Sequence, residues 1–227
     1  MTPVFIHGAG FTAEVFANQR PAFPGAKFPN LPGHACPGSA STIDDFAQAI
    51  EQLAWPDAGE GVVLCGHSMG GAIALQVALR GRLALRGIVL IGSGARMRVA
   101  PAILQDLAGD YEGGIERLAP YFFADPTPER IDWATSLMRT VGPGQTLRDF
   151  RVCDAFDVLE RLGEISVPLL ALTGDSDRMT PSKYALALAD RVPGAQARII
   201  AGAGHFVMVE QAEETNAHIA AFLSGLP

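Results

Sequence analysis

The sequence contains no run of Lys and Arg and none of Asp and Glu, so it has no charged tail and no basic stripe. Its 17 basic and 24 acidic side chains leave a formal net charge of −7 at pH 7. Proteins that bind nucleic acid need clustered positive charge to neutralise the phosphates. We therefore expect no nucleic-acid partner.

Cysteine is also scarce, and Cys36, Cys65 and Cys153 are an odd number at scattered positions. They lack the spacing of metal ligands, which favours reduced thiols in a cytoplasmic protein. The longest apolar runs have the length of strands and are too short to cross a bilayer. The first residues show neither a basic segment nor a cleavage site, so we expect no secretory signal and no membrane association.

The chain has 227 residues, 48% of them hydrophobic, which is enough for one large domain with a sizeable core. Short apolar segments alternate with segments of helical periodicity. Six of the apolar segments are interpreted as strands: residues 3–6, 26–28, 62–65, 85–91, 167–173 and 198–201. Continuous apolar strands that alternate with helices are typical of a parallel sheet with helices on both faces. The sequence therefore predicts a doubly wound α/β fold.

Residues 95–162 interrupt this alternation, because they contain no clear strand and consist of short helical segments separated by Gly and Pro. Apolar and aromatic residues are dense there. We interpret this segment as a helical cap inserted after the fourth strand, and residues 1–94 and 163–227 as the core that carries it. A cap over the edge of a sheet leaves an apolar cleft between the two.

The most informative stretch is residues 66–70, which read GHSMG and fit the pattern G-x-S-x-G between an apolar strand and an Ala/Leu-rich helix. A serine at the apex of so tight a turn has a strained backbone, and a Cβ at either flanking glycine would clash. The turn lifts the Ser68 hydroxyl above the sheet edge, beside the free N–H groups of the new helix. The pattern indicates a nucleophile elbow.

A serine nucleophile needs a general base, and the base needs a carboxylate to orient it. Asp175 and Asp177 follow the fifth strand, and His205 follows the sixth, so all three lie at the sheet edge that Ser68 occupies. The spacing to the Thr-Pro pair at 180–181 favours Asp177 as the acid, and Asp175 remains the alternative.

These motifs resemble those of the α/β-hydrolases over nearly the whole chain. Residues 7–10 (HGAG) resemble the family's oxyanion loop, residues 66–70 its elbow, and the segments around Asp177 and His205 its acid and histidine loops. Family members usually have two further strands before the oxyanion loop, which this chain lacks. The resemblance therefore implies about six strands, all parallel, with residues 26–28 on an edge.

The resemblance also implies roles for individual residues. Ser68 is expected to be the nucleophile, His205 the general base and then acid, and Asp177 the carboxylate that holds the imidazole. The backbone N–H groups of Ala9 and Met69 are expected to form the oxyanion hole, which stabilises the charge of the tetrahedral intermediate. No metal and no organic cofactor is implied.

The function implied is that of a lid-bearing, carboxylesterase-like serine hydrolase, whose partner is a small-molecule ester with a small to medium, rather apolar acyl group. Thioester hydrolysis, carbon–carbon bond hydrolysis and lyase chemistry use similar residues and remain alternatives. A ligand-binding regulatory protein on a hydrolase scaffold is a third hypothesis. Nothing in the sequence indicates an oligomeric state.

Adaptable side chains near the predicted cleft are candidates for the wall of an acyl pocket. These candidates are Met69, Met97, Met138, Met179 and Phe206. The remaining histidines receive no part in the chemistry: His7 is expected to brace its loop, His67 to pack beside the sheet and His218 to be solvated. Whether His34 lines the mouth of the cleft is left open.

Overall fold

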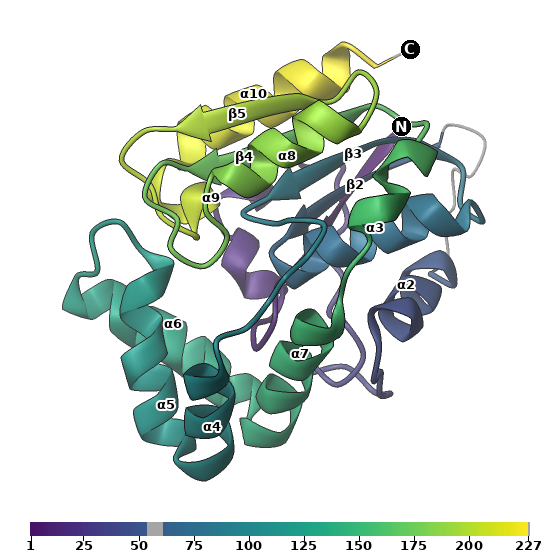
Figure 1. Ribbon diagram of the computed structural model, residues 1–227. Coiled ribbons are helices and arrows are strands. Elements are labelled where there is room, and N and C mark those ends of the chain that lie inside the picture. Colours follow the sequence, from purple (N-terminus) through teal and green to yellow (C-terminus); the bar gives the residue numbers. More distant parts are fainter. Residues whose placement is uncertain (54–60, 227) are drawn as a thin grey trace.

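The structure is a computed structural model that describes residues 1–53 and 61–226. Within these residues one sheet of five parallel strands has the order β1-β2-β3-β4-β5, shown in Figure 1. The strands are β1 (Thr2–Ile6), β2 (Val62–His67), β3 (Leu85–Ile91), β4 (Leu169–Gly174) and β5 (Gln196–Ile200). The predicted parallel α/β fold is confirmed.

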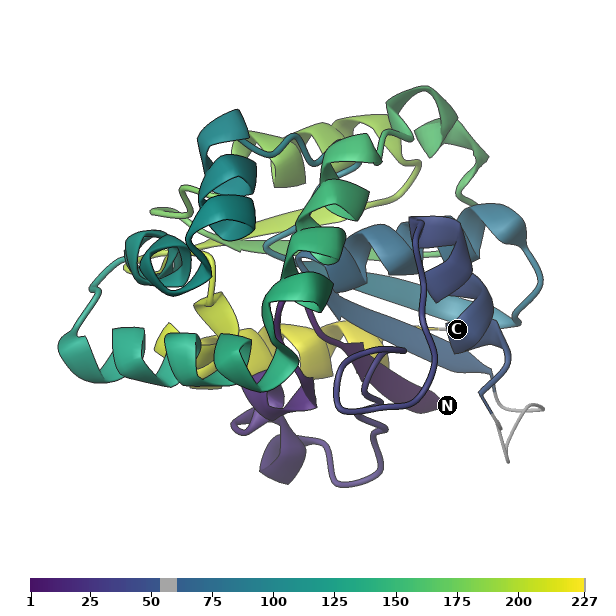
Figure 2. The same ribbon diagram turned by 90° about the horizontal axis from the view of Figure 1, so that it is seen from below.

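Helices cover both faces of the sheet. Outside residues 95–162 they are η1 (Ala13–Phe16), α1 (Gln19–Ala22), α2 (Ile43–Glu51), α3 (Met69–Arg80), α8 (Lys183–Arg191), α9 (Val207–Glu210) and α10 (Ala212–Ser224). Figure 2 shows α1 and α10 on one face of the sheet and α2, α3 and α8 on the other. No helix within the described part of the chain has the combination of length and apolar character that crossing a membrane requires.

Local sequence signals set the ends of the helices. Thr42 accepts a hydrogen bond from the Asp45 N–H, and the Asp45 carboxylate accepts one from the Thr42 N–H, so α2 begins with a capping box. α3 ends at Gly81, which has a left-handed conformation with φ 63° that glycine adopts at little cost.

The predicted strand over residues 26–28 is not a sixth strand of the sheet. It is reduced to one parallel bridge between Lys27 and Val4, on the free edge of β1, where the sequence placed it. Lys27 N–H donates to the Pro3 carbonyl and Phe5 N–H donates to the Lys27 carbonyl. Pro29 has no N–H to donate to the Phe5 carbonyl, and Pro3 of β1 has none to donate to the carbonyl of residue 25, so the pairing stops after one residue.

The order of the strands creates a crevice at the end of β1. From β1 the chain first crosses to residue 27 on one side, and then returns to form β2 on the other side. In open parallel sheets the crevice at such a reversal is where ligands bind, outside the carboxyl ends of the strands. The loop after β1 and the turn after β2 therefore meet at a favourable place for a site.

Residues 95–162, here called the cap segment, contain no strand. Their helices are α4 (Pro101–Gly109), α5 (Tyr111–Leu118), η2 (Ala119–Phe122), α6 (Pro128–Val141) and α7 (Pro143–Ala155), and η3 (Leu159–Glu164) overlaps the end of the segment. The segment begins and ends side by side, because Val158 N–H donates to the Ala95 carbonyl over 2.8 Å. Figure 1 shows these helices beyond the carboxyl ends of the strands. Their division from the core as a separate domain stays a prediction.

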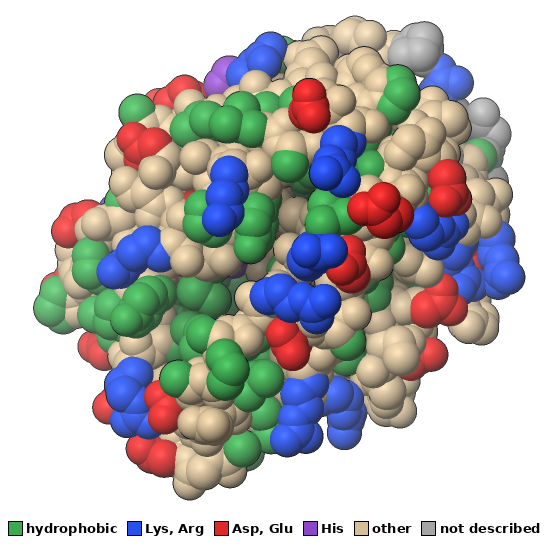
Figure 3. Space-filling model, viewed as in Figure 1, with side chains coloured by type: hydrophobic (Ala, Val, Ile, Leu, Met, Phe, Trp, Pro, Cys, Tyr) green, Lys and Arg blue, Asp and Glu red, His purple; other side chains and the backbone are tan. Residues whose placement is uncertain are grey.

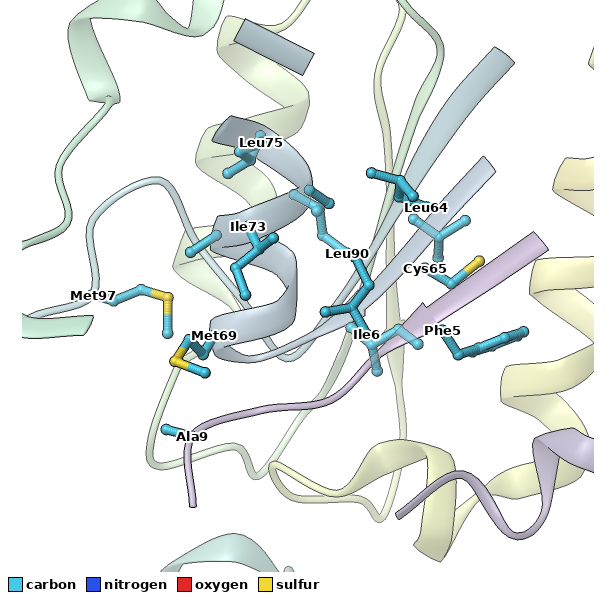
Figure 4. Close-up of a cluster of buried hydrophobic side chains, with 14 of the residues drawn as sticks. Phe5, Ile6, Ala9, Leu64, Cys65, Met69, Ile73, Leu75, Leu90 and Met97 are labelled. Carbon is cyan, nitrogen blue, oxygen red and sulfur yellow. The ribbon is translucent and has the colours of Figure 1, made fainter. Parts of the chain in front are cut away.

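The core beneath the site is made by α3 and the central strands. In Figure 4, Ile73 of α3 lies in one buried cluster with Leu90 of β3 and Ile6 of β1. Each of these side chains is at most 1% exposed. Burial of an aliphatic side chain of this size contributes roughly 1.5–3 kcal/mol. This packing holds the start of α3 against the ends of β1 and β3, which fixes the turn that Ser68 occupies.

Candidate active site

Ser68 connects β2 to α3 with φ 54° and ψ −116°. A positive φ is strained for a residue with a Cβ, so the surroundings must hold it. Ser68 N–H donates to the Ile91 carbonyl over 2.9 Å, and the Ser93 hydroxyl donates to the Ser68 carbonyl over 2.8 Å. The end of β3 therefore stabilises the strained turn from both sides of the Ser68 backbone.

The glycines on either side of Ser68 are required by close backbone contacts. A Cβ on Gly66 would collide with the carbonyl oxygen of Gly70, and a Cβ on Gly70 would collide with that of Ile6. Both obstacles are backbone atoms, which do not move aside as a flexible side chain does. The G-x-S-x-G pattern is therefore explained by the approach of the turn to α3 and β1.

The loops after β4 and β5 bring an aspartate and a histidine together. Asp177 Oδ2 lies 3.0 Å from His205 Nδ1, and both side chains are buried. Asp177 Oδ1 accepts hydrogen bonds from the N–H groups of Met179 and Thr180, each over 2.8 Å. The Thr180 hydroxyl donates to Oδ2 over 2.8 Å. The carboxylate is thus held from several directions while it faces the imidazole.

The environment keeps Asp177 ionised. Burial alone would raise its pKa, but the charge of His205 and the hydrogen bonds from His205 and Thr180 outweigh burial, so the pKa lies below its ordinary value. Asp175, the alternative acid, is exposed and accepts hydrogen bonds from the Ser176 hydroxyl and the Gly202 N–H. Of the two aspartates, the structure brings Asp177 to His205.

Two backbone donors lie beside Ser68. Met69 is the first residue of α3, so its N–H has no acceptor within the helix. The Ala9 N–H lies in the loop after β1, and within the described residues neither N–H has a protein acceptor. Ser68 Cβ lies 3.0 Å from the position that a Cβ on Gly8 would take, so the loop and the turn touch.

These groups surround a cavity of about 160 Å³. Ser68, His205, Gly8 and Ala9 line it on the side of the sheet, and the opposite wall is mostly apolar. That wall is made by Phe11, Met97, Val99, Ala100, Ile103, Phe122, Phe150, Cys153 and Met179, with Arg98 and Arg178 also in the lining. Most of the side chains around the cavity are therefore apolar.

The cavity's apolar lining continues to the molecular surface. Ala100 and Ile103 also border a second hollow, which Leu118 and Tyr121 of the cap segment line. Figure 3 shows hydrophobic side chains gathered on the face that α4, α5 and α6 form. Ala100 and Ile103 therefore lie between the cavity and this second hollow, which Asp106 and Arg117 also line.

The fold described above agrees with the known proteins that the chain resembles. The family model described as the alpha/beta hydrolase family matches residues 4–218. The chain belongs to the alpha/beta hydrolase family. A thermophilic esterase of known structure is 30% identical, with a TM-score of 0.87 over 99% of this chain and 91% of that one.

Two curated relatives of this alpha/beta hydrolase differ in length. The pimeloyl-[acyl-carrier protein] methyl ester esterase of Stenotrophomonas maltophilia is 28% identical over 87% of this chain and 82% of its own. Polyketide synthase ThaQ of Burkholderia thailandensis is also 28% identical, over 86% of this chain, which spans 10% of that protein's length. With the thermophilic esterase and the methyl ester esterase among its relatives, the alpha/beta hydrolase is of the esterase type.

The pocket predictions for this alpha/beta hydrolase are partly wrong. Met97 and Met179 line the cavity, whereas Met69, Met138 and Phe206 do not. Phe206 instead stacks on the His67 ring, with 5.0 Å between the ring centroids. No local sequence pattern identifies Val99, Ile103 or Phe150 as residues that line the cavity. The position of the cap segment over the sheet decides which of its apolar side chains face Ser68.

The other buried histidines of the hydrolase support backbone segments. His67 Nε2–H donates to the His205 carbonyl over 3.1 Å, and burial lowers the pKa of His67 well below its ordinary value. His7 Nδ1–H donates to the Gly8 carbonyl over 3.0 Å, as expected of a residue that braces its loop. His34 is buried and lies outside the cavity lining, so it does not line the mouth.

Proposed function

We propose that this hydrolase cleaves carboxylic esters through an acyl-enzyme on Ser68, with His205 as the general base and Asp177 as its orienting acid. One observation carries the proposal: the Asp177–His205 hydrogen bond of 3.0 Å ends at the cavity that Ser68 also lines. A buried carboxylate that accepts from Nδ1–H leaves Nε2 as the basic nitrogen of the imidazole.

The reaction then follows from the groups around the cavity. Ser68 Oγ attacks the ester carbonyl carbon while its proton passes to His205 Nε2, and the negative charge moves to the carbonyl oxygen. The Ala9 and Met69 N–H groups donate to that oxygen, and one such donor is typically worth about 3–4 kcal/mol. The alcohol leaves with the proton from His205. A water molecule, activated in the same way, releases the acid and restores Ser68.

The cavity supports a small to medium, rather apolar acyl group. Its volume of about 160 Å³ and its wall of Phe, Met, Val and Ile side chains favour an apolar group beside Ser68. Arg98 and Arg178 also border the cavity, and their guanidinium groups donate to the Asp154 and Pro120 carbonyls. An apolar cavity of roughly 150 Å³ is large enough for benzene. The similarity to a methyl ester esterase and to a thermophilic esterase supports an ester as the substrate class.

Replacement of Ser68 tests the nucleophile. We expect Ser68→Ala to lower kcat for p-nitrophenyl butyrate by roughly 10⁴-fold to 10⁶-fold, as removal of a nucleophilic serine does elsewhere. The exposed Ser136 of α6 provides a matched control, because its hydroxyl donates to the Trp133 carbonyl of its own helix, away from the cavity lining. Turnover by Ser68→Ala at the rate of Ser136→Ala would exclude the proposal.

The two aspartates provide a second matched pair. Asp177→Asn removes the carboxylate that holds His205, so kcat is expected to fall by roughly 10⁴-fold, whereas Asp175→Asn keeps most activity. The same assays with a thioester and a β-diketone of equal acyl length discriminate ester hydrolysis from the alternative reactions that the sequence leaves open.

A further inference from the structure

A buried polar cluster lies beneath the loop that carries Ala9, and the proposed reaction does not use it. Its members are His7 of that loop, His34, and Gln145 and Asp149 of α7. Here it is called the loop clamp. Both His34 and Asp149 are completely buried, and the His7 and His34 rings lie 4.8 Å apart. Burial of a polar group costs free energy unless the group has a hydrogen-bond partner. The polar atoms of the loop clamp are therefore expected to be hydrogen-bonded to one another or to the backbone.

Asp149 is the centre of the loop clamp. Its Oδ2 accepts a hydrogen bond from the Gly10 N–H over 2.8 Å and lies 2.6 Å from His34 Nε2. Its Oδ1 accepts one from the Gln145 side-chain N–H over 2.7 Å. His34 Nδ1–H donates to the Pro32 carbonyl, so His34 Nε2 and the carboxylate share one proton. The carboxylate therefore joins the cap segment to the loop after β1.

The loop clamp holds the peptide groups on both sides of Ala9. On one side, the Gly8 carbonyl accepts from His7 Nδ1–H, and the Leu31 N–H in turn donates to His7 Nε2, each over 3.0 Å. The Gly8–Ala9 peptide is planar, so a fixed carbonyl also fixes the direction of the Ala9 N–H. On the other side, Asp149 fixes the next peptide through the Gly10 N–H.

Gly10 needs the hydrogen bond to Asp149 in order to keep its backbone conformation. Its φ of 72° is a conformation that only glycine adopts readily, and glycine has the most flexible backbone of all residues. Thr146 Cγ2 and Met138 Cε pack against its Cα side, at 3.0 and 3.3 Å from the position a Cβ would take. These contacts oppose movement toward the cap segment, and the hydrogen bond to Asp149 restrains the rotation of the Ala9–Gly10 peptide.

We propose that Asp149 is a positioning residue for catalysis. From α7 it holds the Ala9–Gly10 peptide, while His7 holds the Gly8–Ala9 peptide. With Ala9 fixed on both sides, its N–H stays directed at the oxygen of the tetrahedral intermediate. This role rests on the proposed function, because it acts through the oxyanion hole. It also means that the oxyanion hole is complete only when α7 is packed on the loop after β1, so the cap segment takes part in transition-state stabilisation as well as in lining the cavity.

The test compares Asp149→Ala with Asp149→Asn. The alanine variant loses the acceptor for Gly10, so kcat for p-nitrophenyl butyrate is expected to fall about tenfold to hundredfold, less than the loss of a whole oxyanion donor, with KM within about threefold. The asparagine variant keeps one oxygen for the Gly10 N–H and is expected to recover most of that loss. Binding of a boronic acid, which forms a tetrahedral adduct on Ser68, weakens in parallel with kcat.

Glu51→Gln provides a control for stability alone. Glu51 pairs with Arg80 between α2 and α3, outside the cavity lining, so this change lowers the urea midpoint without changing kcat. Parental kcat in folded Asp149→Ala would overturn the proposal, and so would a lower kcat with unchanged boronic acid affinity. If the alanine variant does not fold, Asp149→Leu replaces it, because leucine has nearly the shape of aspartate without the acceptor oxygens. A loss of kcat of about tenfold to hundredfold then supports the proposal, and parental kcat overturns it. Full activity of Ser68→Ala would instead refute the proposed function.

Discussion

His7 illustrates how burial fixes the protonation state of a single residue. Burial and the nearby His34 lower its pKa from 6.5 to about 3, and these effects outweigh the hydrogen bond to the Gly8 carbonyl, which raises it. The hydrogen bonds agree, because Nε2 accepts from the Leu31 N–H and can do so only without a proton. His7 is therefore neutral in the folded protein across the physiological range.

This neutrality makes stability depend on pH. Between pH 6.5 and about 3 the unfolded chain binds a proton at His7 and the folded chain does not, so acid favours unfolding. His7→Gln is expected to make the loss of unfolding free energy shallower by about 1.4 kcal/mol per pH unit in that window. Urea unfolding at several pH values between 4 and 6 measures this slope.

Leu31→Ala is the control for the His7 experiment. Leu31 is buried in the same region but does not titrate, so its truncation lowers stability at every pH and leaves the slope unchanged. Equal slopes for the parent and His7→Gln would mean that His7 is protonated in the fold.

Among the elements, the unit formed by β1, β2 and α3 depends most on glycine. Gly70, in the first turn of α3, faces the Ile6 carbonyl so closely that a Cβ has no room. Gly70→Ala would push α3 away from β1, and we expect a loss of at least about 3 kcal/mol in unfolding free energy. Chemical denaturation measures it, and a loss below about 1 kcal/mol would contradict the close contact.

Replacement of Gly81, at the other end of α3, is the control that measures backbone strain without a steric clash. It has φ 63°, but among the described residues beyond its chain neighbours no heavy atom lies within 4 Å of the position that a Cβ would take, so Gly81→Ala is expected to meet the cost of a left-handed alanine. That cost is about 1–2 kcal/mol. Replacement of Gly70, inside α3, is therefore expected to lower the unfolding free energy more than replacement of Gly81, which follows the helix.

At the scale of the whole molecule, Glu210 links the cap segment to the histidine loop. Its carboxylate, 2% exposed, accepts from the Gly204 N–H over 2.7 Å and from the Ala124 N–H over 3.0 Å, and pairs with Arg130 at 3.2 Å. Glu210→Ala leaves these donors without their acceptor. We expect a loss of about 2–3 kcal/mol in unfolding free energy, measured by urea denaturation.

An exposed acid provides the comparison for Glu210. Glu164 pairs with Arg161 at 2.8 Å, but both side chains are about half exposed, and such pairs contribute little. Glu164→Ala is expected to change stability by less than about 0.5 kcal/mol. Similar losses of unfolding free energy for Glu210→Ala and Glu164→Ala would show that the contacts of Glu210 between the cap segment and the histidine loop do not stabilise the protein.

The sequence by itself determined the features that depend on neighbouring residues. The run from β2 through Ser68 into α3 is local, because an apolar strand, two glycines and an Ala/Leu-rich helix each act within a few residues. The alternation of strands and helices likewise predicts the parallel sheet, and the order of motifs predicts that Asp177 and His205 follow strands that end at the same edge.

Only the tertiary structure decided what depends on distant residues. It reduced the strand at 26–28 to one bridge, brought Asp177 and not Asp175 to His205, and chose Met97 and Met179 from the predicted wall. Asp149 and Gly10 are 139 residues apart, and no local pattern marks them as partners. The physical reason is that such contacts arise when the cap segment packs on the sheet, and packing depends on the shapes of both surfaces together.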